Sequence, residues 1–179
     1  MTITASRDEG ILKRVRGTPL PTWAYMGGRI GQSILITILL VLIVSAFGYF
    51  AYGVQFPIDR LPFMLAALVL GAATFCALGI AITGFIPNSD AAPAIVNLST
   101  LPLLFVSNVF IQVGPGFPSW IETLSKVFPV RHFADLIQMS WDPRITSVTF
   151  DPVPWVVIGI WFVIGVVVSI RFFSWEPRT

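Results

Sequence analysis

The chain has 179 residues, of which 55% are hydrophobic and only 11% are charged, and its formal net charge is +2. A soluble domain carries about 25% charged residues, so a soluble core of this size could not hide so much apolar surface. The composition therefore excludes an ordinary soluble protein and indicates a membrane protein, and the single cysteine, Cys76, excludes a disulfide within the chain.

The first element is a compact charged segment, SRDEGILKRVRGTPLP, at residues 6–21. Ser6 and Glu9 have the spacing of a capping box, which predicts a short helix at the membrane surface. Gly17 and Pro19 end this helix, and a stiff turn joins it to the first apolar stretch. Such a geometry suits a lever that receives force from another protein. The alternative is a basic anchor that only orients the next span and touches anionic lipid.

Four apolar stretches are long enough to cross a membrane, which takes about 20 residues. They lie at about 30–53, 61–86, 91–111 and 154–173, and Thr22 is expected to cap the helix that leads into the first. The fourth stretch is almost wholly aliphatic and aromatic, so we expect it to face lipid. Small and polar residues of the first two stretches are interpreted as close-packing positions: Gln32, Ser33, Thr37, Gly71, Thr74, Gly79 and Thr83.

Lysine and arginine residues cluster before the first span and after the fourth, which predicts that the N- and C-termini are both cytoplasmic. Because the positive charges lie beside spans, we do not interpret the basic pI, near 9.0, as nucleic-acid binding. The sequence thus predicts an all-α fold: a polytopic helical membrane protein in which residues 1–179 form a single transmembrane domain.

The segment at 112–152 has apolar residues at helical spacing, but neither of its halves is long enough to span. Pro118 and Pro129 each suit a helix start. We expect two short amphipathic helices that lie in the outer interface or dip into it and return. His132, the only histidine, is interpreted as an interfacial residue with no catalytic role.

The third span carries a polar stripe of Asn97, Thr100, Ser107 and Asn108. The stripe could line a substrate path or meet a partner subunit, but contacts between helices of the chain's own bundle are the favoured interpretation. No ionisable residue falls in the central part of any span, which argues against ion coupling and intramembrane catalysis. No phosphate-binding G-x-x-x-x-G-K-[ST] loop is present either, so we predict no catalytic residue, metal site or cofactor in this chain.

The stretch SRDEGILKRVRGTPLPTWAYMGGRI resembles the cytoplasmic coupling segment of permease subunits of ABC-type exporters of the daunorubicin-resistance-like group. The residues at 101–137 resemble the fifth span and outer re-entrant helices of that family, and RFFSWEPR resembles its C-terminal tail. The positions that fit the coupling pattern are Arg7, Glu9, Gly10, Leu12, Lys13, Arg14, Arg16, Thr18, Pro19, Leu20 and Pro21, whereas Asp8 adds an acid that departs from it.

The resemblance implies a permease subunit that moves a hydrophobic or amphipathic, drug-like compound out of the cell. A separate ATPase subunit would bind ATP and Mg²⁺, dock on residues 6–21 and drive a pair of permease chains in the bacterial plasma (inner) membrane. Family members have six spans, so a chain with four is expected to correspond to the C-terminal two thirds of a permease. An ion-coupled secondary transporter and a non-transporting assembly or scaffold protein remain alternatives.

Overall fold

The computed structural model describes residues 21–54, 57–86, 90–106, 123, 125–141 and 151–172. Within these ranges all regular structure is helical, which confirms the all-α prediction. In chain order the elements are α3 (Thr22–Tyr52), the 3-10 helix η1 (Ile58–Arg60), α4 (Leu61–Thr83), α5 (Ala92–Val106), α7 (Pro129–Trp141) and α8 (Pro152–Phe172).

Three of these stretches are long and apolar enough to cross a membrane: Trp23–Tyr52, Ile58–Thr83 and Pro152–Phe172. They correspond to the first, second and fourth predicted spans. Of the third, the structure describes α5, which has 15 residues and continues through Pro102. Residues 107–111 lie outside the described part of the chain, so a span at 91–111 stays a prediction.

The first helix begins at Thr22, eight residues before the apolar stretch at 30–53 and within one residue of the start that a Thr22 cap implies. Pro21 occupies the N-cap position with φ −71° and ψ 147°, so the expectation that Thr22 caps this helix is wrong. The turns of α3 that precede Ile30 include Arg29, whose guanidinium lies over the ring of Tyr25 at 5.7 Å from its centroid. An arginine near the end of a span can keep its charge at the interface in this way while the helix continues.

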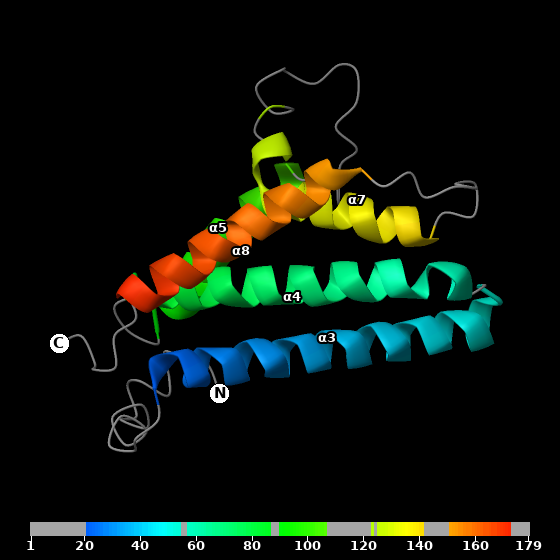
Figure 1. Cartoon of the computed structure of the whole chain (residues 1–179), viewed down its shortest axis with the longest axis horizontal. Coiled ribbons are helices and arrows are strands. Elements are labelled where there is room, and N and C mark those ends of the chain that lie inside the picture. The colour runs from blue at the N-terminus through cyan, green and yellow to red at the C-terminus, as the bar shows by residue number, and fades with distance from the viewer. Residues whose placement is uncertain are drawn as a thin grey trace.

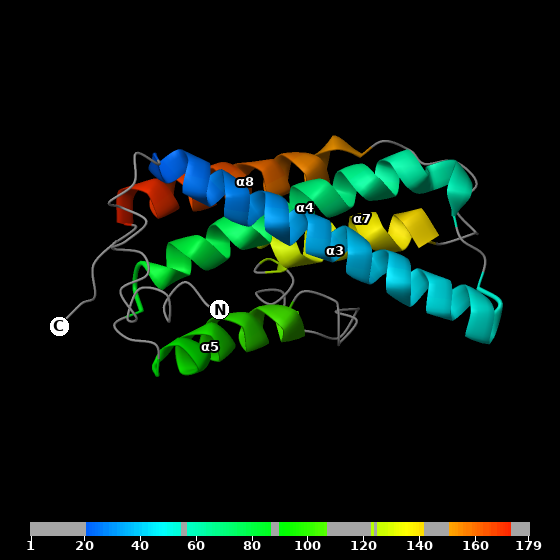
Figure 2. The same ribbon diagram turned by 90° about the horizontal axis from the view of Figure 1, so that it is seen from below.

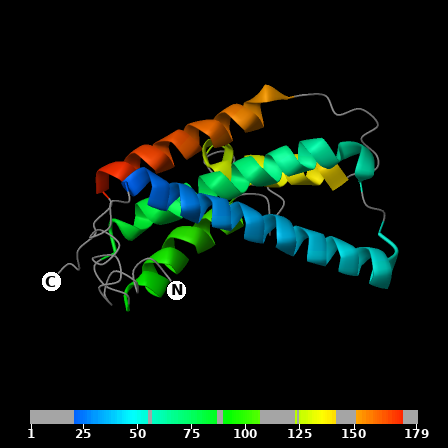
Figure 3. The ribbon, with the colours of Figure 1, turned by 60° about the horizontal axis from the view of Figure 1, so that its bottom comes forward.

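The long helices pack around α4 (Figure 1). α3 runs antiparallel to α4 and α8 runs parallel to it, so α3 begins and α8 ends at the same end of the bundle. We call the other end, where α3 gives way to η1 and α4, the η1 end. Figures 2 and 3 show α5 set to one side of the other helices.

α8 packs against α4, so the prediction that the last span simply faces lipid is wrong for one of its faces. A β-carbon at Gly165 would lie 3.1 Å from both the β-carbon of Ala77 and the amide nitrogen of Leu78, which shows how closely the backbones approach. One turn further, the Ser169 hydroxyl donates to the Ala77 carbonyl at 2.9 Å. Small residues four apart permit this kind of contact between membrane helices.

The close-packing predictions for the first two spans are right in part. Thr74 is fully buried, and its hydroxyl donates to the Leu70 carbonyl at 2.8 Å and lies 3.4 Å from the Ile158 carbonyl of α8. Gly71 is also a close-packing position, because the ring of Phe133 lies against its α-carbon. Gln32 is exposed, and a β-carbon at Gly79 would meet nothing within 4 Å, so neither is a close-packing position within this chain.

Candidate functional site

The short helix α7 is amphipathic and begins at Pro129, as predicted. Aromatic contacts hold the N-terminal end of α7 against α4 and α8. The ring of Phe133 lies over Gly71 and packs edge-on against Phe75, with 5.5 Å between ring centroids. Just before α7, the ring of Phe128 stacks on Trp161 at 5.6 Å, and the Trp161 indole nitrogen donates to the Val127 carbonyl at 2.8 Å.

These contacts fix the depth of α7. Gly71 lies near the middle of α4, and Trp161 lies near the middle of α8. Because both helices are long enough to span, the residues that contact them at these points lie near mid-membrane. We therefore infer that the start of α7 lies at the depth of the hydrocarbon core and not at its surface.

The other end of α7 lies at the η1 end of the bundle. There the Arg60 guanidinium donates from Nη1 to the Met139 carbonyl at 2.9 Å. α7 thus runs alongside α4, antiparallel to it (Figures 1 and 3), and its 13 residues rise about 20 Å. These contacts favour, of the two predicted alternatives, the segment that dips into the membrane and returns, which stays a prediction. The other short helix, expected after Pro118, lies mostly outside the described residues.

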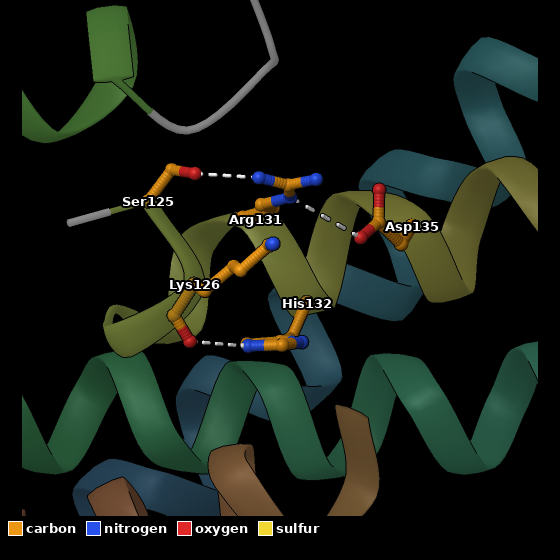
Figure 4. Close-up of polar contacts among 5 residues, drawn as sticks. All are labelled: Ser125, Lys126, Arg131, His132 and Asp135. Atoms are coloured by element: carbon orange, nitrogen blue, oxygen red, sulfur yellow. Dashed lines mark hydrogen bonds and ion pairs between the residues drawn. The ribbon is translucent and has the colours of Figure 1, made fainter. Parts of the chain in front are cut away.

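This depth brings a cluster of polar side chains into the core (Figure 4). Arg131 donates from Nη1 to the Ser125 hydroxyl, 2.6 Å away, and its Nε lies 3.9 Å from a carboxylate oxygen of Asp135. His132, only 8% exposed, donates from Nε2 to the Lys126 carbonyl at 2.7 Å. Figure 4 shows the basic side chains around the first turn of α7 and Asp135 one turn further on.

Ionisable groups at this depth are costly. A lysine, arginine or aspartate at the centre of a span costs about 2.5–3.5 kcal/mol on insertion scales, so such residues usually mark a ligand or ion pathway. The ion pair of Arg131 and Asp135 is loose at 3.9 Å, compared with about 2.7–2.9 Å for a charge-assisted hydrogen bond. The internal contacts therefore compensate only part of the cost.

A cavity of about 300 Å³ opens beside the cluster, between α7 and the first turns of α8. Lys126 and Arg131 line the end of the cavity beside the first turn of α7, which we call its deep end. Asp151, which directly precedes α8, lines its outer end. The complete lining is Lys126, Arg131, His132, Asp135, Met139, Asp151, Val153, Pro154 and Val157.

A second cavity, of about 200 Å³, lies at the opposite end of the bundle among α3, α4 and α8. Its lining is almost entirely apolar, from Trp23 and Met26 on α3 to Phe162 and Ile170 on α8. Among the residues that the structure describes, no group of three His, Cys, Asp or Glu side chains could hold a metal ion.

The sequence profile of the ABC-2 type transporter family matches residues 1–140. This chain belongs to the ABC-2 type transporter family. It is also 23% identical, over 136 residues, to the probable multidrug ABC transporter permease YbhR of Escherichia coli K12, and equally to that of E. coli O157:H7. The match covers 76% of this chain and 36% of each relative, so the chain spans about a third of their length. No solved structure matches significantly.

Membership of the ABC-2 family confirms the resemblance to ABC permeases that the sequence suggested and makes the chain a membrane component of an ABC transporter. The profile match includes the predicted coupling segment, but residues 6–20 lie outside the described part of the chain. Their docking role stays a prediction. Only Pro21, at the N-cap of α3, is described.

The polar stripe of the third predicted span is described at two of its four positions. Asn97 and Thr100 are both exposed on α5, and Ser107 and Asn108 lie outside the described residues. The favoured interpretation, contacts within the chain's own bundle, therefore gains no support from Asn97 or Thr100. Exposed polar groups on an apolar helix fit a partner subunit or a path better.

The sequence analysis missed the polar cluster of α7. Lys126 and Arg131 entered the prediction only as charges that orient the chain, and His132 only as an interfacial residue. A signal was present, because Arg131 and Asp135 are four residues apart on the polar face of an amphipathic helix, and Lys126 lies shortly before it. What the pattern could not supply was the depth at which this face lies.

Proposed function

We propose that this chain forms part of the permease of an ABC exporter, which moves a hydrophobic or amphipathic compound out of the cell. The energy would come from ATP, bound with Mg²⁺ and hydrolysed by a separate subunit. Membership of the ABC-2 family supports this proposal, and so does the name of YbhR as a probable multidrug permease.

One observation carries the mechanism. α3 is an unbroken helix of 31 residues, about 46 Å long, that starts immediately after the predicted coupling segment at 6–21. Pro21 restricts the backbone at this junction. A push on the segment would therefore be delivered to one end of a stiff rod and not absorbed by a flexible linker. Glu9, Lys13 and Arg14 would be docking contacts, and Gly10 would allow close approach.

The bundle also suits the proposed placement in a bacterial plasma membrane. The start of α3 and the end of α8 lie together at one end of the bundle (Figure 1), which we place at the cytoplasmic face. The apolar window of α3 has no buried residue within this chain. That surface is available to lipid or to other parts of a permease dimer.

A second candidate is favoured by the polar cluster. Ion-coupled secondary transporters need ionisable groups at membrane depth, and Lys126, Arg131 and Asp135 supply such groups although the long helices do not. The two functions differ in their energy source. Transport that persists without ATP and collapses with the ion gradient would favour the secondary transporter.

The docking role is tested by co-purification with an ABC ATPase subunit expressed together with this chain. Glu9→Ala removes an acid of the coupling pattern, and Asp8→Ala removes the neighbouring acid that departs from it. Truncating one partner of a desolvated charge pair costs about 2–5 kcal/mol, so Glu9→Ala should reduce recovery of the ATPase at least about tenfold. Asp8→Ala should leave recovery near the wild-type level.

Equal recovery with both variants, or no ATPase with the wild-type chain, would contradict the assignment of residues 6–21 as the docking element. Size-exclusion profiles of the variants in mild detergent provide the folding control. If Glu9→Ala loses ATPase and transport together while the bundle stays intact, the segment couples ATP hydrolysis to movement.

A further inference from the structure

The cavity beside α7 has charge of opposite sign at its two ends. Lys126 and Arg131 lie at its deep end, next to the contacts with the middles of α4 and α8. Asp135 lies one helical turn toward the η1 end, and Asp151 directly precedes α8. The charge that lines the cavity therefore changes from positive beside the start of α7 to negative at Asp135 and the start of α8.

Arg131 and Asp151 each keep capacity for a further hydrogen bond beyond their contacts with Ser125 and Val153. Arg131 meets Asp135 only loosely, at 3.9 Å, and their side chains stay 19% and 32% exposed. One carboxylate oxygen of Asp151 accepts from the Val153 amide at 3.0 Å, and a carboxylate has a second oxygen. A guanidinium and an ammonium at one end are suited to a phosphate or carboxylate, and two carboxylates at the other are suited to an amine.

We propose that this cavity binds the zwitterionic head group of an amphiphile. The anionic group, next to the apolar tail, would lie between Lys126 and Arg131, and the amine, farther from the tail, would lie near Asp135 and Asp151. This order matches a head group of the phosphoethanolamine type, whose phosphate is proximal to the tail and whose amine is distal.

The dimensions and the walls fit a head group better than a whole amphiphile. At about 300 Å³ the cavity is at the lower limit of small-molecule sites, which span about 300–1,000 Å³. Met139, Val153, Pro154 and Val157 give it apolar walls around the charged ends. A ligand at this depth must also carry an apolar part, because the long helices around it are in lipid.

Two sources could supply this chemistry: a resident membrane lipid or the exported compound. The binding claim stands on the cavity alone, whereas the identity of the ligand as cargo rests on the proposed export function. In the second case the cavity would hold the head group of the cargo near mid-membrane, on its way to the η1 end.

The test is native mass spectrometry of the whole chain in mild detergent. Three probes of equal chain length are offered: a phosphatidylethanolamine, a phosphatidylglycerol and an alkylammonium. The wild-type chain should retain the zwitterionic lipid over both others by about tenfold, the effect of one added charge-assisted contact. Arg171→Gln, at the far end of α8, is the control and should change nothing.

Two variants separate recognition from a structural role. Arg131→Gln should weaken both phospholipids and spare the alkylammonium, while Asp135→Asn should weaken the zwitterionic lipid and spare phosphatidylglycerol. Arg131→Lys keeps the charge and should keep the preference. A wild-type chain that does not prefer the zwitterionic lipid, or variants that weaken all three probes equally, would overturn the proposal.

Proteoliposomes with the ATPase subunit then distinguish the sources. A labelled phosphatidylethanolamine that changes leaflet only with ATP is cargo, and one that binds with the same selectivity but does not move is a resident lipid; both results support the site. If no ATPase associates, the export function fails, while the selectivity measured on the chain alone still decides the binding site.

Discussion

Replacing Gly71 with alanine would test how α7 is held in the membrane. A β-carbon at this position would overlap the ring of Phe133, the residue that places the start of α7 at mid-depth. The ring has little room to rotate away. It packs edge-on against Phe75 and belongs to the core around Ala67 and Leu136, which are 0% and 1% exposed.

The expected cost follows from the packing. Inserting a methyl group into a well-packed core costs about 1–3 kcal/mol. Gly79→Ala is a matched control on the same helix, because a β-carbon there would meet nothing within 4 Å. Alanine is favoured over glycine in a helix by about 0.5–1 kcal/mol, so this control should be neutral or stabilising. The two variants should therefore differ by about 2 kcal/mol in the free energy of unfolding.

Unfolding in mixed micelles measures this difference, and a double-mutant cycle with Phe133→Leu assigns its cause. In the Phe133→Leu background, Gly71→Ala should cost much less, since the smaller side chain leaves room for the methyl group. The coupling between the two sites should be about 1 kcal/mol or more. The reasoning is refuted if Gly71→Ala matches Gly79→Ala, or if its cost is the same in both backgrounds.

Two further substitutions test the other contacts of the bundle by the same unfolding measurement. Gly165→Ala should destabilise the α4–α8 interface by about 1–3 kcal/mol, because backbone atoms of α4 lie against it and cannot rotate away; Gly159→Ala, with open space, should not, and equal effects would contradict the close approach. Trp161→Phe keeps an aromatic ring for Phe128 but removes the donor to the Val127 carbonyl, so it should cost about 0.5–1.5 kcal/mol. The exposed Trp23 offers a Trp→Phe control, and a larger loss there would count against this role of the indole.

The features that the sequence predicted are those with local causes. Long apolar runs predicted three of the candidate spans, and the amphipathic spacing that begins at Pro129 predicted α7. The start of α3 near Thr22 was also predicted, although Gly27, Gly28 and Arg29 precede the apolar stretch. In the structure the helix continues through the glycines, and Arg29 turns toward Tyr25.

The contacts of α8 could not be predicted for a different reason. Lipid tails and protein side chains are equally apolar, so hydrophobicity does not distinguish a lipid-facing helix from a packed one. The distinguishing residues are Gly165 and Ser169, two small positions in an otherwise bulky helix. The depth of α7 depends likewise on Phe133 meeting Gly71, a contact between residues far apart in the sequence.

The two ends of the α4–α8 pair differ in a way that explains where the cavity lies. Toward the end opposite η1, Gly165 and Ser169 bring the backbones into contact. Toward the η1 end, the helices diverge (Figure 1) and are bridged by large rings, with Phe63 and Trp155 at 5.4 Å between centroids. α7 fills the resulting wedge.

Because α7 is fixed to α4 by Phe133 and by Arg60, the cavity has one wall that belongs to α4 and α7 and another that belongs to α8. A change in the angle between α4 and α8 would widen or narrow this space while the close contact at Gly165 persisted. Charged side chains on the long helices would instead face lipid or a tightly packed helix contact, where they are costly. Placed on α7, they lie at the wide end of the α4–α8 pair, where the larger of the two described cavities opens.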